Sequence, residues 1–233
     1  MTTSESAPAP DPFRYEVKYV ARASDLHRLL AWVQNTGAGF TEPYPQRQVN
    51  NIYFDTFDHF AYAENLSGAS ARSKVRFRWY GEVDQPEKGT LEVKRRRTGV
   101  GWKLSFPVGP LTLAGVPWAT IRQALRRQLP AVAQLWLDAN PQAILINRYH
   151  RRYFQSADQK VRLTVDWNQR VYDERHSGVP NLTRLANLPD TLVVELKFDR
   201  RDRPLANRYA QGLPLRLSRN SKYVVGVQAI THD

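Results

Sequence analysis

Polar and apolar residues alternate along eight segments of the chain. This is the period of a β-strand that buries one face, because successive side chains of a strand point to opposite sides. The predicted strands are Phe13–Arg22, Gln48–Phe54, Lys74–Tyr80, Thr90–Arg96, Trp102–Val108, Ile144–Phe154, Arg162–Trp167 and Leu192–Phe198. So many strands of similar length predict a large antiparallel sheet or barrel.

Helical spacing of apolar residues interrupts this strand pattern. Ser24–Gly37 places Leu26, Leu29, Leu30 and Val33 on one helix face. A longer helical stretch over Val116–Ala139 is broken at Pro130, and shorter helices are expected at Asp58–Leu66, Pro204–Ala210 and Ser221–Ile230. We therefore predict an α+β fold with one domain over residues 13–233, preceded by a small, polar, disordered tail over residues 1–12.

Charged residues follow the strand period in six of the predicted strands. Each of these strands has one charged face and one strongly apolar face. The charged faces carry Arg14, Glu16 and Lys18; Lys74, Arg76 and Arg78; Glu92 and Lys94; Lys103; Arg162 and Asp166; and Glu195 and Lys197. A Glu-x-Lys spacing recurs three times in this set, and Asp166 is expected to pair with Arg162.

Two interpretations of these charged faces are open. They could be solvated, as in an ordinary antiparallel sheet with an apolar core on its other side. Alternatively they face inward, which is costly for an empty barrel but well matched to a phosphate chain with a divalent cation. Arginine forks suit phosphate oxygens and carboxylates suit the metal, and the helices would then pack outside against the apolar strand faces.

The overall composition limits the kinds of ligand and the kinds of chemistry that are expected. The chain has 233 residues with 34 Lys+Arg against 22 Asp+Glu, a net charge of +12, which favours a polyanionic partner. There is no cysteine, so disulfides, thiolate metal sites and cysteine nucleophiles are excluded. No apolar stretch is long enough for a membrane span or a signal peptide, so a cytoplasmic protein is expected.

Several motifs, in this order, resemble the VTC domain of the triphosphate tunnel metalloenzyme superfamily. The VTC domain is the polyphosphate polymerase domain of vacuolar transporter chaperone proteins and their bacterial relatives. The resemblance extends from about Phe13 to about Val227. The matching segments are Val49-Asn50-Asn51-Ile52-Tyr53-Phe54-Asp55-Thr56, Glu64-Asn65-Leu66, Lys74-Val75-Arg76-Phe77-Arg78-Trp79-Tyr80-Gly81, Leu91-Glu92-Val93-Lys94 and Ser221-Lys222-Tyr223.

This resemblance implies an eight-stranded antiparallel β-barrel, or triphosphate tunnel, with helices packed outside. It implies an enzyme that uses Mn²⁺ or Mg²⁺ and transfers the γ-phosphate of ATP to a growing polyphosphate chain. The partners are then ATP and inorganic polyphosphate rather than nucleic acid. Vacuolar relatives also carry membrane helices, which this chain lacks, so export of the product would need a membrane partner protein.

The resemblance also implies roles for single residues. Contacts to the transferred phosphate or the triphosphate are implied for Lys18, Arg76, Arg78 and Arg148, and metal binding for Glu195, which together form the catalytic set. Further candidate metal ligands are Glu16 and Glu92. Further candidate substrate-binding residues are Arg14, Lys74, Lys94, Lys103, Arg162, Lys197, Ser221 and Lys222.

One departure from the superfamily pattern bears on the reaction. Hydrolytic members begin with Glu-x-Glu-x-Lys, whereas Arg14 stands at the first Glu position here. This removes one metal ligand, adds phosphate-binding charge and favours polymerase over hydrolase. A tripolyphosphate or nucleoside triphosphate hydrolase on the same tunnel, and a non-catalytic polyphosphate binder, are the alternatives. Exposed aromatic residues interleaved with basic ones would favour a binder, but the aromatics here lie opposite the charges.

Overall fold

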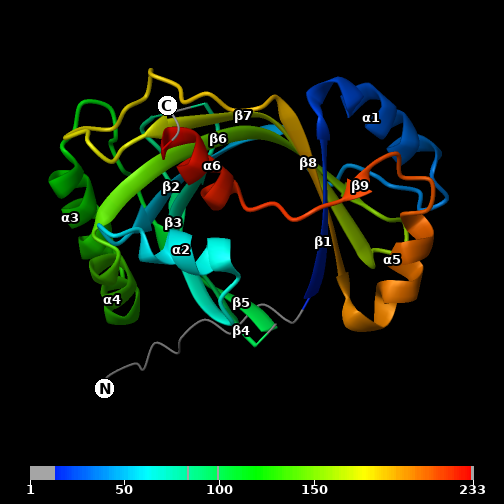
Figure 1. Cartoon of the computed structure of the whole chain (residues 1–233), viewed down its shortest axis with the longest axis horizontal. Helices are drawn as coiled ribbons and strands as arrows, with labels where there is room; N and C mark the ends of the chain where they lie inside the picture. The colour runs from blue at the N-terminus through cyan, green and yellow to red at the C-terminus, as the bar shows by residue number, and fades with distance from the viewer. Residues whose placement is uncertain (1–13, 83, 99, 232–233) are drawn as a thin grey trace.

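Nine antiparallel strands form one curved sheet in the computed structural model, which describes residues 14–82, 84–98 and 100–231 (Figure 1). The eight predicted strands are all present, with ends that differ by a few residues. They are β1 (Arg14–Arg22), β2 (Arg47–Asp55), β3 (Ala71–Tyr80), β4 (Gly89–Arg97), β5 (Val100–Val108), β6 (Gln142–Gln155), β7 (Val161–Asp173) and β8 (Thr191–Asp199). A short unpredicted strand, β9 (Arg216–Leu217), pairs with β1.

The strand order is β5-β4-β3-β2-β6-β7-β8-β1-β9, and every pairing is antiparallel. In the described part of the chain, no pairing joins β5 to the β1–β9 end, so the predicted closed barrel is not confirmed. The sheet nevertheless curves so strongly that β4 and β1 approach each other across its inner face. Lys94 of β4 lies 3.4 Å from Glu16 of β1, although five other strands lie between these two in the sheet order.

The outer face of the sheet is apolar and carries two helical layers. The helices α3 (Trp118–Gln128) and α4 (Ala131–Ala139) cover the residues of β3 and β4 that alternate with the charges, such as Phe77 and Leu91. At the other end, α1 (Leu26–Asn35) and α5 (Arg203–Tyr209) cover β7 and β8 around Leu163 and Leu196. Short 3₁₀ turns, Ala23–Asp25 and Arg200–Asp202, precede α1 and α5.

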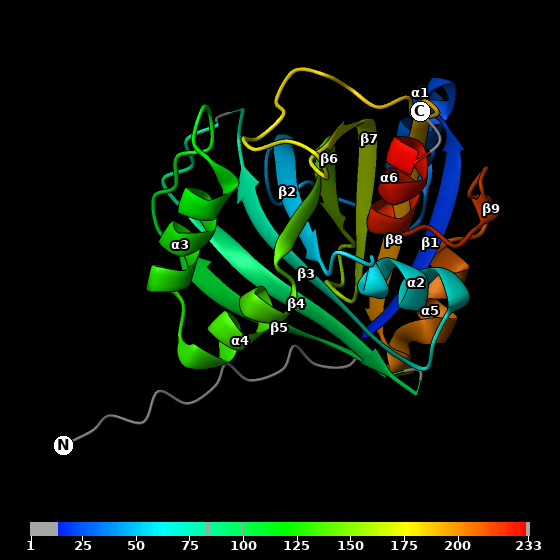
Figure 2. The same ribbon diagram turned by 60° about the vertical axis from the view of Figure 1, so that its left-hand side comes forward.

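Two helices depart from the expectation that all helices pack outside. Figures 1 and 2 show α2 (Phe60–Ser67) and α6 (Lys222–Thr231) lying within the curve of the sheet. They pack on inner-face residues that are apolar rather than charged, chiefly Tyr53 of β2 and Leu145 of β6. The two helices shield these apolar side chains from water and thereby close one end of the inner face.

The helices of the described part of the chain are all too short or too polar to cross a membrane. The predicted disordered tail, residues 1–12, lies outside the described residues.

Candidate functional site

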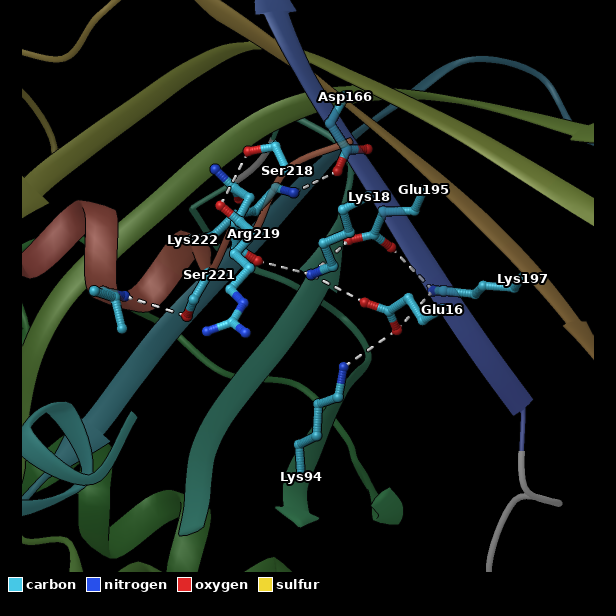
Figure 3. Close-up of polar contacts among 12 residues, drawn as sticks. Glu16, Lys18, Lys94, Asp166, Glu195, Lys197, Ser218, Arg219, Ser221 and Lys222 are labelled. Atoms are coloured by element: carbon cyan, nitrogen blue, oxygen red, sulfur yellow. Dashed lines mark hydrogen bonds and ion pairs between the residues drawn. The ribbon is translucent and has the colours of Figure 1, made fainter. Parts of the chain in front are cut away.

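Charged side chains from seven strands and from α6 converge on the inner face. Figure 3 shows the part of this set around Lys18 and Glu195. We call this set the charged cluster. Its cations are Lys18, Lys74, Arg76, Arg78, Lys94, Lys103, Arg151, Lys197 and Lys222, and its carboxylates are Glu16, Glu92, Asp166 and Glu195. The cluster is defined by nine cations and four carboxylates, so positive charge is in excess. These charged strand faces therefore point inward, which confirms the orientation that the second interpretation requires.

Glu92 organises one half of the charged cluster. Its carboxylate lies 2.6 Å from Arg76, 3.7 Å from Arg78 and 3.0 Å from Lys103. Burial would raise the pKa of Glu92, but these three cations outweigh burial and hold the pKa well below its usual range. The pKa of Arg76 is raised in turn, because the attraction of Glu92 exceeds the penalty of burial. Glu92 thus holds three cationic side chains of this half in place.

Two side chains of β2 accept hydrogen bonds from Arg76 and Arg78. The side-chain oxygen of Asn51 accepts a hydrogen bond from Arg78 Nε at 2.9 Å, and the hydroxyl of Tyr53 accepts one from Arg76 at 3.2 Å. In the β2–β3 pairing, Arg78 stands opposite Asn51 and Arg76 stands opposite Tyr53. The Asn-Asn-Ile-Tyr segment therefore fixes which way the guanidinium groups point.

Lys18 joins two carboxylates in the other half. Its ammonium lies 2.9 Å from Glu16 and 3.2 Å from Glu195, and it donates to the carbonyl oxygen of Asn220 at 3.0 Å. Burial and the charge of Glu195 raise the pKa of Glu16, but Lys94, Lys18 and Lys197 outweigh them and bring it to about 2. The pKa of Glu195 is likewise far below normal, because nearby cations, Lys197 first, overcome its burial.

Arg151 is a central residue that the sequence-based assignment missed. It forms a two-pronged ion pair with the buried Asp166, at 2.5 and 2.7 Å, and lies 4.0 Å from Glu195. Asp166 also receives Lys222 at 2.6 Å. The expected pairing of Asp166 with Arg162 is therefore wrong, since Arg151 and Lys222 occupy both carboxylate oxygens.

Tyr149 lies among these cations and is fully buried. The ammonium of Lys222 sits 4.7 Å above its ring, and its hydroxyl lies 3.5 Å from a nitrogen of Arg78. Burial alone would raise the pKa of Tyr149, yet Arg151 and Arg78 lower it. The neighbouring cations therefore outweigh burial at this hydroxyl.

Lys74 has an ammonium without a carboxylate partner among the described residues. It donates to the hydroxyl of Ser221 at 2.9 Å. Burial first, and then the like charges of Lys94, Lys18, Arg76 and Arg72, lower the pKa of Lys74 to about 7. An anion placed beside this amine would relieve the repulsion.

Two predicted residues, Arg148 and Arg162, stand apart from the charged cluster. Arg148 lies on the outer face, where it pairs with Asp84 and stacks at 5.4 Å on Tyr172, because the period of β6 that turns Tyr149 and Arg151 inward turns Arg148 outward. Placing Arg148 in the catalytic set is thus contradicted by its position. Arg162 lies on the inner face but is exposed, at the end of β7. Arg14 opens β1, and its side chain lies outside the described residues.

The three predicted metal ligands do not form one group, and the described residues contain no cluster of three or more His, Asp or Glu suited to a metal. Glu92 is held apart by Arg76 and Lys103. Glu16 and Glu195, however, converge on the same ammonium group of Lys18. Two carboxylates fit a Mg²⁺ or Mn²⁺ ion that takes its remaining ligands from phosphates and water.

Comparison with known proteins assigns the fold and the family. The chain shares its fold with a Vibrio parahaemolyticus protein provisionally assigned as an adenylate cyclase, at 13% identity and a TM-score of 0.50, over 91% of this chain and 97% of that one. The PH1819 protein of Pyrococcus horikoshii OT3 is also similar, with 13% identity, the same coverage and a TM-score of 0.47. No curated protein matches the sequence.

The VTC domain family matches residues 13–231, nearly the whole chain. The protein therefore belongs to the VTC domain family, as the sequence motifs predicted. At 13% identity, the Vibrio parahaemolyticus structure shows the fold alone.

Proposed function

We propose that this protein is an ATP-dependent polyphosphate polymerase. In this proposal the charged cluster binds the triphosphate of ATP and the end of an inorganic polyphosphate chain. The observation that carries it is the excess of cations on the inner face, where nine cationic side chains meet four carboxylates. Such an excess lacks compensation inside the protein and suits a polyanion.

Phosphoryl transfer needs positioning and charge stabilisation more than covalent chemistry. An oxygen of the terminal chain phosphate attacks the γ-phosphorus, the bond between that phosphorus and the β–γ bridging oxygen breaks, and ADP leaves with the electron pair. Arg76 and Arg78, fixed by Glu92 and by β2, would bind the γ-phosphate oxygens on which charge develops. Lys18 would orient the attacking phosphate. That phosphate is already ionised near neutral pH, so no general base is required.

Glu16 and Glu195 would hold the divalent cation, Mn²⁺ or Mg²⁺, which would neutralise phosphate charge when bound. Lys18 lies 2.9 Å from Glu16 and 3.2 Å from Glu195, and Lys197 lies 3.1 Å from Glu195 and 4.0 Å from Glu16, so both carboxylates already attract cations. In this proposal the protein works in the cytoplasm, with ATP as its substrate.

The test is to incubate the protein with ATP and Mn²⁺ and to measure ADP, free phosphate and polymer in the same samples. The proposal predicts ADP and acid-labile polymer in proportion, with little free phosphate before acid treatment. Arg76→Gln should reduce both products about 100-fold or more, whereas Arg201→Gln, at a side chain that is 83% exposed, should change neither. Free phosphate without polymer would favour a hydrolase instead, and binding without turnover would favour a non-catalytic binder.

A further inference from the structure

Arg47 lies in a group of tyrosines beside the charged cluster. Its guanidinium carbon is 4.1 Å from the ring centre of Tyr80, 4.8 Å from that of Tyr153 and 5.6 Å from that of Tyr44. Tyr44 and Tyr153 meet edge to face at 5.8 Å. We call Arg47 and these three tyrosines the tyrosine–arginine group.

The inner-face order of β6 places this group opposite the closed end. Leu145 lies under α6, Tyr149 and Arg151 follow within the charged cluster, and Tyr153 comes last. Arg47 is the register partner of Arg151, and the ring of Tyr153 touches both guanidinium groups, at 4.8 and 5.7 Å. The tyrosine–arginine group is therefore directly continuous with the cluster.

Exposure rises in the same direction. The side chain of Arg78 is 11% exposed, whereas Tyr80, two residues further along β3 on the same face, is 43% exposed and Tyr44 is 55% exposed. A chain lying along the cluster would reach solvent past these side chains, since α2 and α6 cover the other end.

The chemistry of Arg47 favours a phosphate as its partner. In the described part of the chain it has no carboxylate partner, and its one hydrogen bond runs from Nε to the Tyr153 hydroxyl at 3.4 Å. The tyrosine rings cover the guanidinium, which leaves the N–H groups at its edge to bind an anion. The same packing holds Arg47 in one orientation over one face of the Tyr80 ring.

We propose that Arg47 binds a phosphate of a polyphosphate chain that extends beyond the charged cluster, and so acts as a chain-length subsite. This inference rests on the proposed function, because it assumes that the cluster holds the end of the chain. Tripolyphosphate would fill the cluster and leave Arg47 free, whereas longer chains would engage both.

The experiment is a calorimetric titration of the full chain with tripolyphosphate, with a medium-length inorganic polyphosphate and with a non-hydrolysable ATP analogue. Arg47→Gln should weaken binding of the longer chain about tenfold, the loss of one charge-assisted contact, and leave the other two ligands unchanged. Arg47→Lys keeps the charge without the planar fork and should lie in between. Arg201→Gln is the matched surface control.

Unchanged affinity of Arg47→Gln for the longer chain would overturn the inference. So would an equal loss for tripolyphosphate, which would place Arg47 in the cluster itself, or a loss confined to the ATP analogue, which would indicate nucleobase binding. If Arg47→Gln fails to fold, Arg47→Lys decides by the same comparison. If the unmodified protein binds neither tripolyphosphate nor the chain, the proposed function itself fails.

Discussion

Tyr223 donates a hydrogen bond to the carboxylate of Asp55 at 2.5 Å and thereby ties α6 to the end of β2. Asp55 is fully buried and also accepts from the backbone nitrogens of Ala61 and Tyr62, which open α2. One carboxylate thus fixes both helices that close the inner face. Because Lys222 precedes Tyr223, the same bond positions a cation of the charged cluster.

Tyr223→Phe should lower both stability and ligand affinity. The change leaves a buried oxygen of Asp55 without this donor, which costs about 1–3 kcal/mol of unfolding free energy. Burial and then the charge of Asp55 raise the pKa of Tyr223, so the hydroxyl stays protonated and the effect should be constant across neutral and mildly alkaline pH. Urea unfolding at two pH values measures it. Stability equal to that of the unmodified protein would show that this bond does not hold α6.

Arg76→Gln and Arg148→Gln should have different effects, because the two arginines lie on opposite faces of the sheet. Arg76 lies in the cluster, so its loss should reduce turnover about 100-fold or more. Arg148 pairs with Asp84 on the outer face, so its loss should reduce stability and leave turnover of the folded fraction nearly unchanged. Initial rates on folded protein distinguish them. A loss of turnover in Arg148→Gln as large as in Arg76→Gln would contradict the assignment of faces.

Arg151→Gln should destabilise the protein strongly. It leaves the fully buried Asp166 with Lys222 as its remaining close cation, and breaking one side of a buried ion pair costs about 3–5 kcal/mol. Asp166→Asn combined with Arg151→Gln should recover part of the loss, because the uncompensated charge is then removed. Thermal unfolding of the three variants checks this. An additive double variant would show that the pair is not coupled.

Lys74 should make phosphate binding depend on pH near neutrality. Its pKa is lowered to about 7, first by burial and then by neighbouring cations. A bound phosphate favours the charged amine, so binding takes up a proton above pH 7 and affinity falls as pH rises through this value. The ratio of affinities between the unmodified protein and Lys74→Gln removes the titration of the ligand itself. A ratio that is flat from pH 6 to pH 9 would contradict the lowered pKa.

Much of the fold follows from local pattern. The alternation of polar and apolar residues located all eight long strands. In β3 it also assigned Lys74, Arg76 and Arg78 to one face and Phe77 to the other, because each face of this strand carries one kind of residue. The closed barrel was not confirmed, since closure depends on the curvature of the whole sheet. The inner positions of α2 and α6 were missed as well, because they depend on a few apolar residues, such as Tyr53, Leu145 and Val171, at one end of a face that also carries the charges.

The choice between Arg148 and Arg151 shows where sequence reasoning fails for the site. Arginines occupy both faces of β6 near its middle, so charge does not reveal which face points inward. The signal that could have decided the face was the type of residue found two positions before and after each arginine. Tyr149 and Tyr153 share the period of Arg151, and their rings lie 5.3 and 5.7 Å from its guanidinium. The pairing of Lys94 with Glu16 depends on distant strands meeting across the sheet.

The most direct measurement is a crystal structure of the protein with a non-hydrolysable ATP analogue and Mn²⁺. We expect the γ-phosphate oxygens within hydrogen-bond distance, about 3 Å, of Arg76 and Arg78, with Mn²⁺ beside Glu16 and Glu195. A triphosphate bound at the outer face, or one that leaves the charged cluster with its present ion pairs, would contradict the account.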